Sequence, residues 1–514
     1  MTSNISSKTT IAKNTTLLYA RTVLILVVSL YTSRVILQAL GVEDYGVYTA
    51  IGGVVSILTV VIGPIDIAIS RFLTFELGRG DRDRLRRYFS TGLTIMILFS
   101  ILSIILLETV GLWFLNNKMV MDPSRMTAAN WVLHLSIAAF VVNMISAPYR
   151  AAIIAHERMS LFAYMGILDA LLKLAVAFAI KFSPTDKLIL YAALLLAVSV
   201  LVRFIYTLIC NKEFEECHKP KMKVDRELFG GLLSFAGWNM FGAASLACRN
   251  QGVNILFNLF GGPVVNAAFG IANQMNGAVG NFVGNFTTAL NPSIIKSYAS
   301  EQKDYMMSLI YQGAKYTYFL VLLFALPLLL ETEYVTKLWL GQTPDFSVSF
   351  IQLMLLHSLI ESLSKTIMAG THASGRIRKY QFVVGTFQIL VLPVAYVLLL
   401  MEFSPIVALV SSLLIDIIAL LVRLFLARGI FSLSIRAFMG KVLLVSALVT
   451  IVAAVIPLTL RILFEESLLR FFVVCVLCVV STALSVLYVG CTTTERRSIM
   501  AKAGQIWKRV INRL

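Results

Sequence analysis

Long apolar stretches follow one another along almost the whole chain. A helix needs about 20 apolar residues to cross the hydrocarbon core of a bilayer. By that measure the pattern predicts about fourteen membrane-spanning helices, at residues 15–39, 45–76, 89–115, 129–153, 161–183, 188–210, 229–260, 264–295, 309–331, 347–370, 380–401, 405–427, 438–460 and 469–489. The expected fold class is therefore an all-α polytopic membrane protein.

A short pattern of residues occurs twice in the chain. A gapless shift of about 221 residues superimposes its two copies: Gly41 on Gly262, Tyr48 on Phe269, Arg82-Asp83 on Lys303-Asp304, and Gly92 on Gly313. A duplicated membrane bundle indicates a transporter, because parallel repeats place a binding cavity between two similar lobes.

The repeat also predicts how the chain is divided. We expect an N-lobe of six helices at residues 1–210, a cytoplasmic linker at 211–228 and a C-lobe of six helices at 229–427. Two further helices would follow at 428–489, and a basic amphipathic tail at 490–514 would lie on the anionic inner leaflet.

Composition and charge support a membrane protein and exclude other classes. Hydrophobic residues make up 58% of the chain and charged residues 14%, and the mean hydropathy is +0.83. The net charge of +17 does not indicate a nucleic-acid partner, because the cations gather on alternate connections such as Arg79–Arg87, Lys212–Arg226 and the tail from Arg496. The positive-inside rule then places both termini in the cytoplasm.

Signals for catalysis or metal binding are lacking in the sequence. The connections between spans are too short to hold a catalytic domain, and no Walker A, H-E-x-x-H or G-x-S-x-G pattern occurs. Cys475 and Cys478 form a C-x-x-C pair inside an apolar helix without a second pair, which is typical of lipid-facing residues. We expect no enzyme activity, no metal and no cofactor.

Ionisable residues inside the spans are the candidates for function, because each costs several kcal/mol to place in hydrocarbon unless it faces a cavity or a partner. Cations outnumber anions, which favours an anionic solute such as a phosphate or pyrophosphate. The candidate substrate-binding cations are Arg34, Lys173, Arg203 and Arg249. Arg34 and Arg249 could instead extend to the outer interface.

Titratable groups in the spans are candidates for coupling to an ion gradient: Asp66, Asp169, His357, Glu361 and Asp416. Asp169 lies four residues before Lys173, so the two can form a salt bridge that only helps the helix insert. His357 and Glu361 form a polar stripe that is consistent with a proton relay or with the wall of a solvated cavity. Asp416 would be protonated or paired with a cation of another helix.

The seventh and eighth spans are rich in amides, among them Asn250, Asn254, Asn273 and Gln274. Amides donate and accept hydrogen bonds, which suits sugar hydroxyls or a hydrated lumen. They also join helices to one another in membranes. We favour the lumen because so many amides occur together.

Three segments carry a resemblance to a known family: LGVEDYGVY, SRFLTFELGRGDRDRLRRYFSTG and LNPSIIKSYASEQKDYMMSLIYQG. They resemble the polysaccharide-transporter family, which contains the O-antigen and capsule flippases and belongs to the superfamily of the multidrug and toxic compound extruders. The resemblance implies two six-helix lobes plus two C-terminal helices.

It also implies a function. The family exports undecaprenyl-pyrophosphate-linked oligosaccharides across the bacterial cytoplasmic (inner) membrane by alternating access, coupled to a gradient of H⁺ or Na⁺ or to the membrane potential. The implied partners are the lipid-linked oligosaccharide, membrane lipids, and the polysaccharide polymerase with its chain-length machinery.

Three alternatives stay open at this point. A peptidoglycan-precursor flippase would handle similar chemistry. A multidrug antiporter of the same superfamily usually exports cations, for which a cationic cavity is a poor host. A non-transporting scaffold of an envelope-assembly complex would gain nothing from the insertion cost of so many charges.

The charge distribution generates a topology prediction. Reporter fusions at residues 84, 220 and 514 should give cytoplasmic signal, and fusions at 122 and 340 should give periplasmic signal. The inverted pattern would contradict the assignment of the positively charged connections to the cytoplasm.

Overall fold

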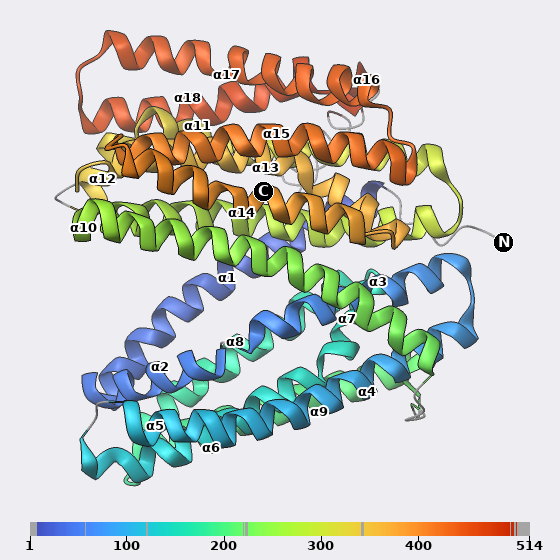
Figure 1. Ribbon diagram of the computed structural model, residues 1–514, viewed down its shortest axis with the longest axis vertical. Coiled ribbons are helices and arrows are strands. Elements are labelled where there is room, and N and C mark those ends of the chain that lie inside the picture. The colour runs from blue at the N-terminus through green and yellow to red at the C-terminus, as the bar shows by residue number, and fades with distance from the viewer. Residues whose placement is uncertain are drawn as a thin grey trace, which may run out of the picture. The chain divides into compact units, whose positions relative to one another are not determined.

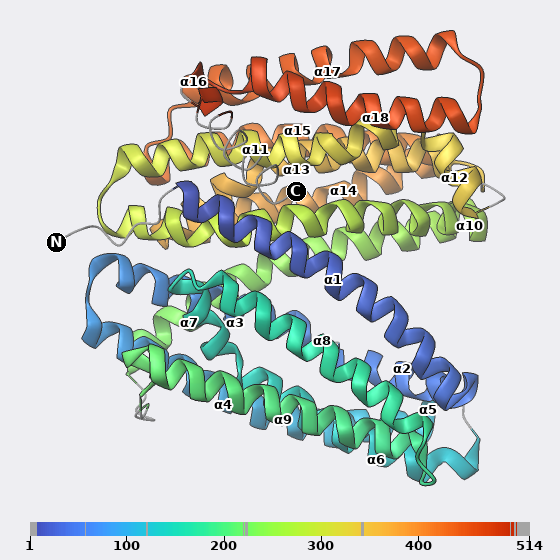
Figure 2. The same cartoon turned by 180° about the vertical axis from the view of Figure 1, so that it is seen from behind.

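The computed structural model describes residues 8–56, 58–119, 122–218, 220, 225–340, 344–493, 495–497 and 500. Within these residues every regular element is a helix (Figures 1 and 2). Most of the tail at 490–514, for which the sequence predicts an amphipathic helix, lies outside the described residues.

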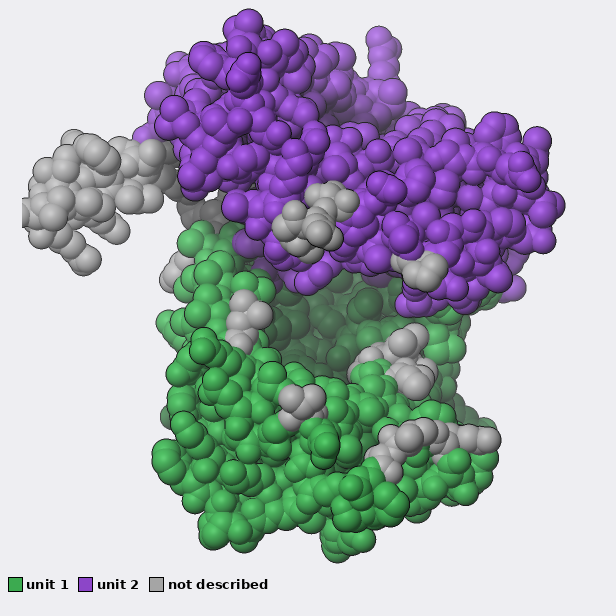
Figure 3. Space-filling model, turned by 90° about the vertical axis from the view of Figure 1, so that its left-hand side faces the viewer, with its two compact units in different colours: residues 1–244, 288–303 green, residues 245–287, 304–514 purple. Residues whose placement is uncertain are grey.

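The chain forms two compact units, which Figure 3 distinguishes by colour. Unit 1 contains residues 1–244 and 288–303, and unit 2 contains residues 245–287 and 304–514. The long helix α10 (Arg226–Ala299) contributes its two ends to unit 1 and its middle to unit 2. The predicted lobe boundaries at 210 and 229 stay a prediction.

The other helices of unit 1 precede α10. They are α1 (Lys8–Leu40), α2 (Val42–Ser56), α3 (Thr59–Arg79), α4 (Arg82–Leu106), η1 (Leu107–Gly111), α5 (Leu112–Lys118), η2 (Pro123–Arg125), α6 (Met126–Ile145), α7 (Ala147–Ala155), α8 (Met159–Lys181), α9 (Lys187–Glu213) and η3 (Glu215–Cys217).

The other helices of unit 2 follow α10. They are α11 (Lys303–Leu330), α12 (Thr332–Leu340), α13 (Ser347–Ser374), α14 (Arg378–Leu400), α15 (Pro405–Phe431), α16 (Ile435–Phe438), η4 (Met439–Leu443), α17 (Leu444–Leu463), α18 (Leu468–Ser485) and η5 (Val486–Gly490).

The described residues contain 11 helices that are long and apolar enough to cross a membrane. Three more stretches have sufficient length: α2 together with α3, and the two arms of α10 on either side of Gly262. The amides of α10 lower its hydropathy, although its length and packing are those of a spanning helix. An all-α polytopic membrane fold is thereby confirmed, while the count of about fourteen spans stays a prediction.

The internal repeat is visible in the backbone. Gly41 and Gly262, which the shift of about 221 residues superimposes, both have a positive φ, of 82° and 68°. A positive φ recurs at Gly80 and Glu301, which are 221 residues apart, and at Glu157 and Gly375, which are 218 residues apart and follow α7 and α13. α4 and α11 also begin at the superimposed residues Arg82 and Lys303. The two halves of the chain therefore turn at corresponding positions.

Each unit has its own hydrophobic core. In unit 1, α2, α5, α6 and α9 pack around Ile51, Val132 and Ala192. In unit 2, α10, α11 and α13 pack around Phe257, Leu322 and Phe350, and α17 and α18 add Val449 and Cys478. The apolar residues that cover the outside, such as Ile462 and Leu469, are those expected to face lipid.

An ionic cluster joins three elements of unit 1 at one end. Arg125 donates to Asp44 and, at 2.8 Å, to Asp186. Asp186 also caps α9 by accepting from the backbone N–H groups of Leu188 and Ile189. Partial burial raises the pKa of Asp186, but the bonds from Arg125 and these N–H groups outweigh it and lower the pKa below its ordinary value.

This cluster makes the stability of unit 1 depend on pH. A carboxylate with a lowered pKa stabilises the fold above its unfolded pKa of about 3.9 and loses that contribution as the pH falls through the folded value. We expect Asp186→Asn to reduce the free energy of unfolding by about 1 kcal/mol or less at pH 7. In thermal unfolding in detergent, the difference from the wild type should shrink as the pH falls below the unfolded pKa of about 3.9. Asp345→Asn, which removes an exposed carboxylate of unit 2, is the control, and an unchanged difference at low pH would contradict the assignment.

Candidate functional site

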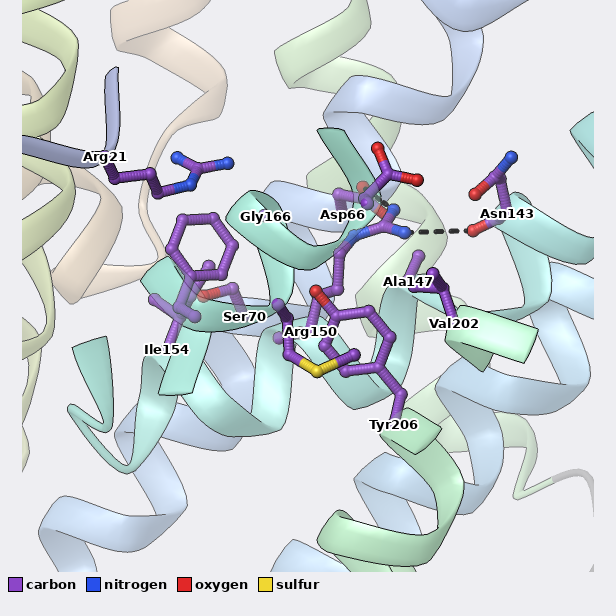
Figure 4. A pocket seen from close by; sticks show the side chains of 14 residues that line it. Arg21, Asp66, Ser70, Asn143, Ala147, Arg150, Ile154, Gly166, Val202 and Tyr206 are labelled. Carbon is purple, nitrogen blue, oxygen red and sulfur yellow. Dashed lines mark hydrogen bonds and ion pairs between the residues drawn. The ribbon is translucent and has the colours of Figure 1, made fainter. Parts of the chain in front are cut away.

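A polar cavity of about 410 Å³ lies inside unit 1 (Figure 4). Its walls come from α1, α3, α6, α7, α8 and α9. The polar residues that line it are Arg21, Asp66, Ser70, Asn143, Arg150, Asp169 and Tyr206. A cavity with this lining is unusual in an apolar bundle, because each ionised group must be compensated.

Two cations compensate the two carboxylates of the unit 1 cavity. Arg150 lies 3.4 Å from Asp66 and donates to the carbonyl oxygen of Asn143 at 3.1 Å. Lys173 pairs with Asp169 at 2.7 Å along α8, as the spacing of four residues predicts. The carboxylates and these two cations therefore balance one another.

Arg21 adds a positive charge that this balance does not include. It makes no ion pair with any described residue, and its Nε has no hydrogen-bond partner among them. Its guanidinium lies over the ring of Phe162, at 4.6 Å from the centroid. Gly166 makes room for it, since a Cβ atom there would come within 2.3 Å of the Arg21 Nε. When Lys173, which pairs with Asp169 from outside the lining, is counted, the cations of this cluster exceed its carboxylates by one.

Unit 2 contains a smaller pocket, of about 120 Å³, beside a buried ionic cluster. Arg249 of α10 donates to both carboxylate oxygens of Asp416, at 2.8 and 2.7 Å. It also donates to Gln388 Oε1 at 2.5 Å and to the hydroxyl of Ser412. Asp416 is 7% exposed and Arg249 is 6% exposed, so this pair is held away from solvent and lipid.

His357 of α13 lies between two carboxylates of the same cluster. Its Nδ1 is 2.6 Å from Asp416 and its Nε2 is 3.7 Å from Glu361, one turn further along α13. Glu361 in turn pairs with Lys365. Two cations and two carboxylates balance here around one imidazole, and protonation of that imidazole would make the cluster positive.

The other predicted site residues do not all lie at one site. Arg34 is exposed on α1 and makes no ion pair with a described residue. Arg203 of α9 lies over the ring of Tyr149, at 5.6 Å. Asn250 and Asn273 line the pocket of unit 2, while Asn254 and Gln274 lie elsewhere on α10.

Several residues of the unit 1 cavity are not among the sequence-based candidates. Arg150 lies near the predicted cytoplasmic end of its span, which favours a side chain that extends to the headgroups. The structure turns it inward instead, because α7 packs against α3 and brings it to Asp66. Ser70 and Tyr206 carry no signal in the sequence beyond being polar residues within spans.

The family of polysaccharide biosynthesis proteins matches residues 11–298, more than half of the chain. The chain belongs to this family. No curated protein matches the chain. Family and fold together support a membrane transporter of the polysaccharide type.

Several solved transporter structures have a similar fold. A MATE structure in its bent conformation aligns with a TM-score of 0.71 at 12% identity, over 86% of this chain and 97% of its own. An outward-facing MATE-family multidrug resistance transporter of the MOP superfamily gives 0.66 at 11% identity, over 82% and 95%. A MOP-superfamily transporter from Pyrococcus furiosus gives 0.68 at 11% identity, over 84% and 96%. At these identities the likeness concerns the fold.

The buried pair of Arg249 and Asp416 should be strongly coupled in stability. Removing one partner leaves an uncompensated charge, which costs about 3–5 kcal/mol. We expect Asp416→Ala and Arg249→Ala each to lower the unfolding temperature in detergent, and the double variant to recover part of the loss. The exposed pair of Lys337 and Glu333 provides the control cycle, for which no measurable coupling is expected. Additive losses at Arg249 and Asp416 would contradict the pairing.

Proposed function

We propose that the protein is a flippase that exports undecaprenyl-pyrophosphate-linked oligosaccharide repeat units across the bacterial inner membrane for surface-polysaccharide assembly. The match of residues 11–298 to the polysaccharide biosynthesis family carries this proposal. The surplus cation of the unit 1 cavity supports it, because the substrate bears negative charge on its pyrophosphate.

Transport would proceed by alternating access. Each unit has its own core, and so each can move as a body while α10 connects them. The charged side chains inside the spans cost free energy to insert into the membrane. A role in binding a charged, hydroxylated solute would explain why the protein keeps them. Both termini would be cytoplasmic, as the charge distribution predicts.

Coupling to a gradient of H⁺ or Na⁺ would use the titratable groups of the two sites. Asp66 and Asp169 line the unit 1 cavity, and His357 and Glu361 line the unit 2 pocket beside Asp416. The lipid-linked oligosaccharide and membrane lipids would be the direct partners, and the polysaccharide polymerase with its chain-length machinery would take up the product.

A multidrug antiporter is the second candidate, because the solved structures with this fold include multidrug resistance transporters. The charge of the unit 1 cavity weighs against it. A cationic drug would meet the surplus charge of Arg21 without a free carboxylate, since Asp66 and Asp169 are already paired.

Export should depend on the cations predicted from the sequence. In a strain whose own gene is deleted, we expect loss of surface polysaccharide and accumulation of lipid-linked oligosaccharide on the inner leaflet. When they replace the deleted gene, Arg34→Ala and Lys173→Ala should restore export only partly, although their protein levels should be normal. Arg34→Ala removes a cation, and Lys173→Ala leaves Asp169 without its partner. Arg249→Ala should also lower the protein level, since it strands the buried Asp416.

Two controls separate the candidate substrates. Arg34→Lys keeps the charge and should export like the wild type. Accumulation of the peptidoglycan precursor in place of the oligosaccharide would favour the precursor flippase, and drug sensitivity with normal polysaccharide would favour the antiporter. Wild-type export by all three alanine variants would contradict a role for these cations.

A further inference from the structure

Two kinds of group meet in the cavity of unit 1: one surplus cation, and several groups that hydrogen-bond to hydroxyls. We propose that this cavity binds a single sugar residue that bears a negative group, either a carboxylate or an attached phosphate. The proposal rests on the proposed function and deepens it, because it assigns one sugar of the transported glycan to a site inside one unit.

The negative group would be bound by Arg21. Of the two arginines that line the cavity, Arg150 is occupied by Asp66 and the Asn143 carbonyl, whereas Arg21 has no ion pair with a described residue. A guanidinium binds carboxylate or phosphate through two parallel N–H groups, and the Nε of Arg21 has no hydrogen-bond partner among the described residues. A bound carboxylate would cancel the charge of Arg21, and a phosphate monoester, with a charge of about −1.5 to −2 at pH 7, would exceed it.

The hydroxyls would be bound by the groups beside Arg21. Asp66 comes from α3 and Tyr206 from α9, and both line the same space as Arg21 (Figure 4). The Oδ1 atom of Asp66 is buried without a hydrogen-bond partner in the described structure. A buried oxygen without a hydrogen bond costs free energy, and this one would accept a hydrogen bond from a sugar hydroxyl. Ser70 and Tyr206 supply hydroxyls that can both donate and accept hydrogen bonds.

The size of the cavity limits the ligand. At about 410 Å³ it lies near the lower end of the range of small-molecule sites, about 300–1,000 Å³. It therefore suits one sugar residue better than a whole oligosaccharide. The pocket of unit 2, at 120 Å³ and with its charges already balanced, offers neither the room nor the free cation.

Gly166 is the positioning residue for this site. Its missing side chain lets the Arg21 guanidinium lie between α1 and α8, over Phe162. A larger residue at this position keeps the charge of Arg21 in the protein but moves its guanidinium. The position of the cation can thus be tested separately from its presence.

The experiment uses the full chain, purified in detergent, with its native cysteines replaced and a reporter Ala147→Cys on α7, which lines the cavity and has no assigned role in binding. The reaction rate of this cysteine with a water-soluble maleimide is measured with D-glucuronate, glucose 1-phosphate, D-glucose or inorganic phosphate. A ligand at roughly ten times its Kd should slow the reaction about tenfold by mass action. Val202→Cys on α9, which also lines the cavity, is a second reporter should the first variant fail to fold.

Slowing by glucuronate alone would identify a uronic acid, and slowing by glucose 1-phosphate alone would identify the phosphate-bearing sugar at the reducing end. Either result, or both, supports the proposal. If inorganic phosphate slows the maleimide reaction as much as the anionic sugars do, the cavity is a plain anion site. If D-glucose slows it as much as they do, Arg21 contributes nothing to binding. If no ligand slows it, the cavity is not a binding site. Each of these three results overturns the proposal.

Matched variants identify the groups responsible. Arg21→Gln and Gly166→Val should abolish the slowing, whereas Gly231→Ala, where a Cβ meets no other atom within 4 Å, should leave it unchanged. A reporter at Asn273→Cys in unit 2 should not be slowed. Slowing that persists in Arg21→Gln would overturn the proposal.

The result is independent of the flippase assay. If no sugar slows the reporter but the deletion strain still loses its polysaccharide, the sugar site is wrong and the export function stands. If the sugars slow the reporter but deletion leaves polysaccharide and lipid-linked oligosaccharide unchanged, the site stands and the proposed export is wrong.

Discussion

An ionised side chain inside a bilayer needs a partner, and this requirement organises the polar interior of both units. Arg249 is held by Asp416, Lys296 by Glu157 and Arg470 by Glu331, and in each pair both side chains are largely buried. The pairs join helices that are distant in sequence, so they fix the packing of the bundle as well as neutralising charge. A cation that lines a cavity without such a partner, as Arg21 does, is therefore a candidate for function, because its contact with the Phe162 ring replaces an ion pair only in part.

The helices and the repeat could be predicted from the sequence because both depend on local patterns. Span length follows from runs of apolar residues, and the match of Arg82 to Lys303 marks the actual beginnings of α4 and α11. The pairing of Asp169 with Lys173 was also readable, since both lie on one helix. The partner of Asp416 was not, because the choice between Arg249 and other cations depends on how α10, α13 and α15 pack.

Depth along a helix was a poor guide to the cavity of unit 1. Arg150 lies near the end of its predicted span, yet it points to Asp66. Arg21 gains its place from Gly166 on a different helix, and no pattern within α1 encodes that contact. The repeat places the two polar sites on corresponding helices, since α1, α6 with α7, and α9 of unit 1 match the first arm of α10, α13 and α15 of unit 2, but the charged side chains stand at different positions along them. The two halves share a backbone and differ in where they keep their charges.

The left-handed turns show the same divergence at single residues. At each of two corresponding turns, one half of the chain has glycine and the other has glutamate: Gly80 with Glu301, and Gly375 with Glu157. A side chain in this conformation strains the backbone. Glu157 compensates by binding Lys296 at 3.0 Å, so its turn ties α7 to the last turns of α10, whereas Glu301 has no ion pair with a described residue. Replacing Glu301 by glycine would thus relieve backbone strain without removing an ion pair. The same replacement at Glu157 would remove the ion pair with Lys296, which joins two parts of the chain that are distant in sequence. Of two turns with the same backbone conformation, only the one at Glu157 therefore also holds helices together.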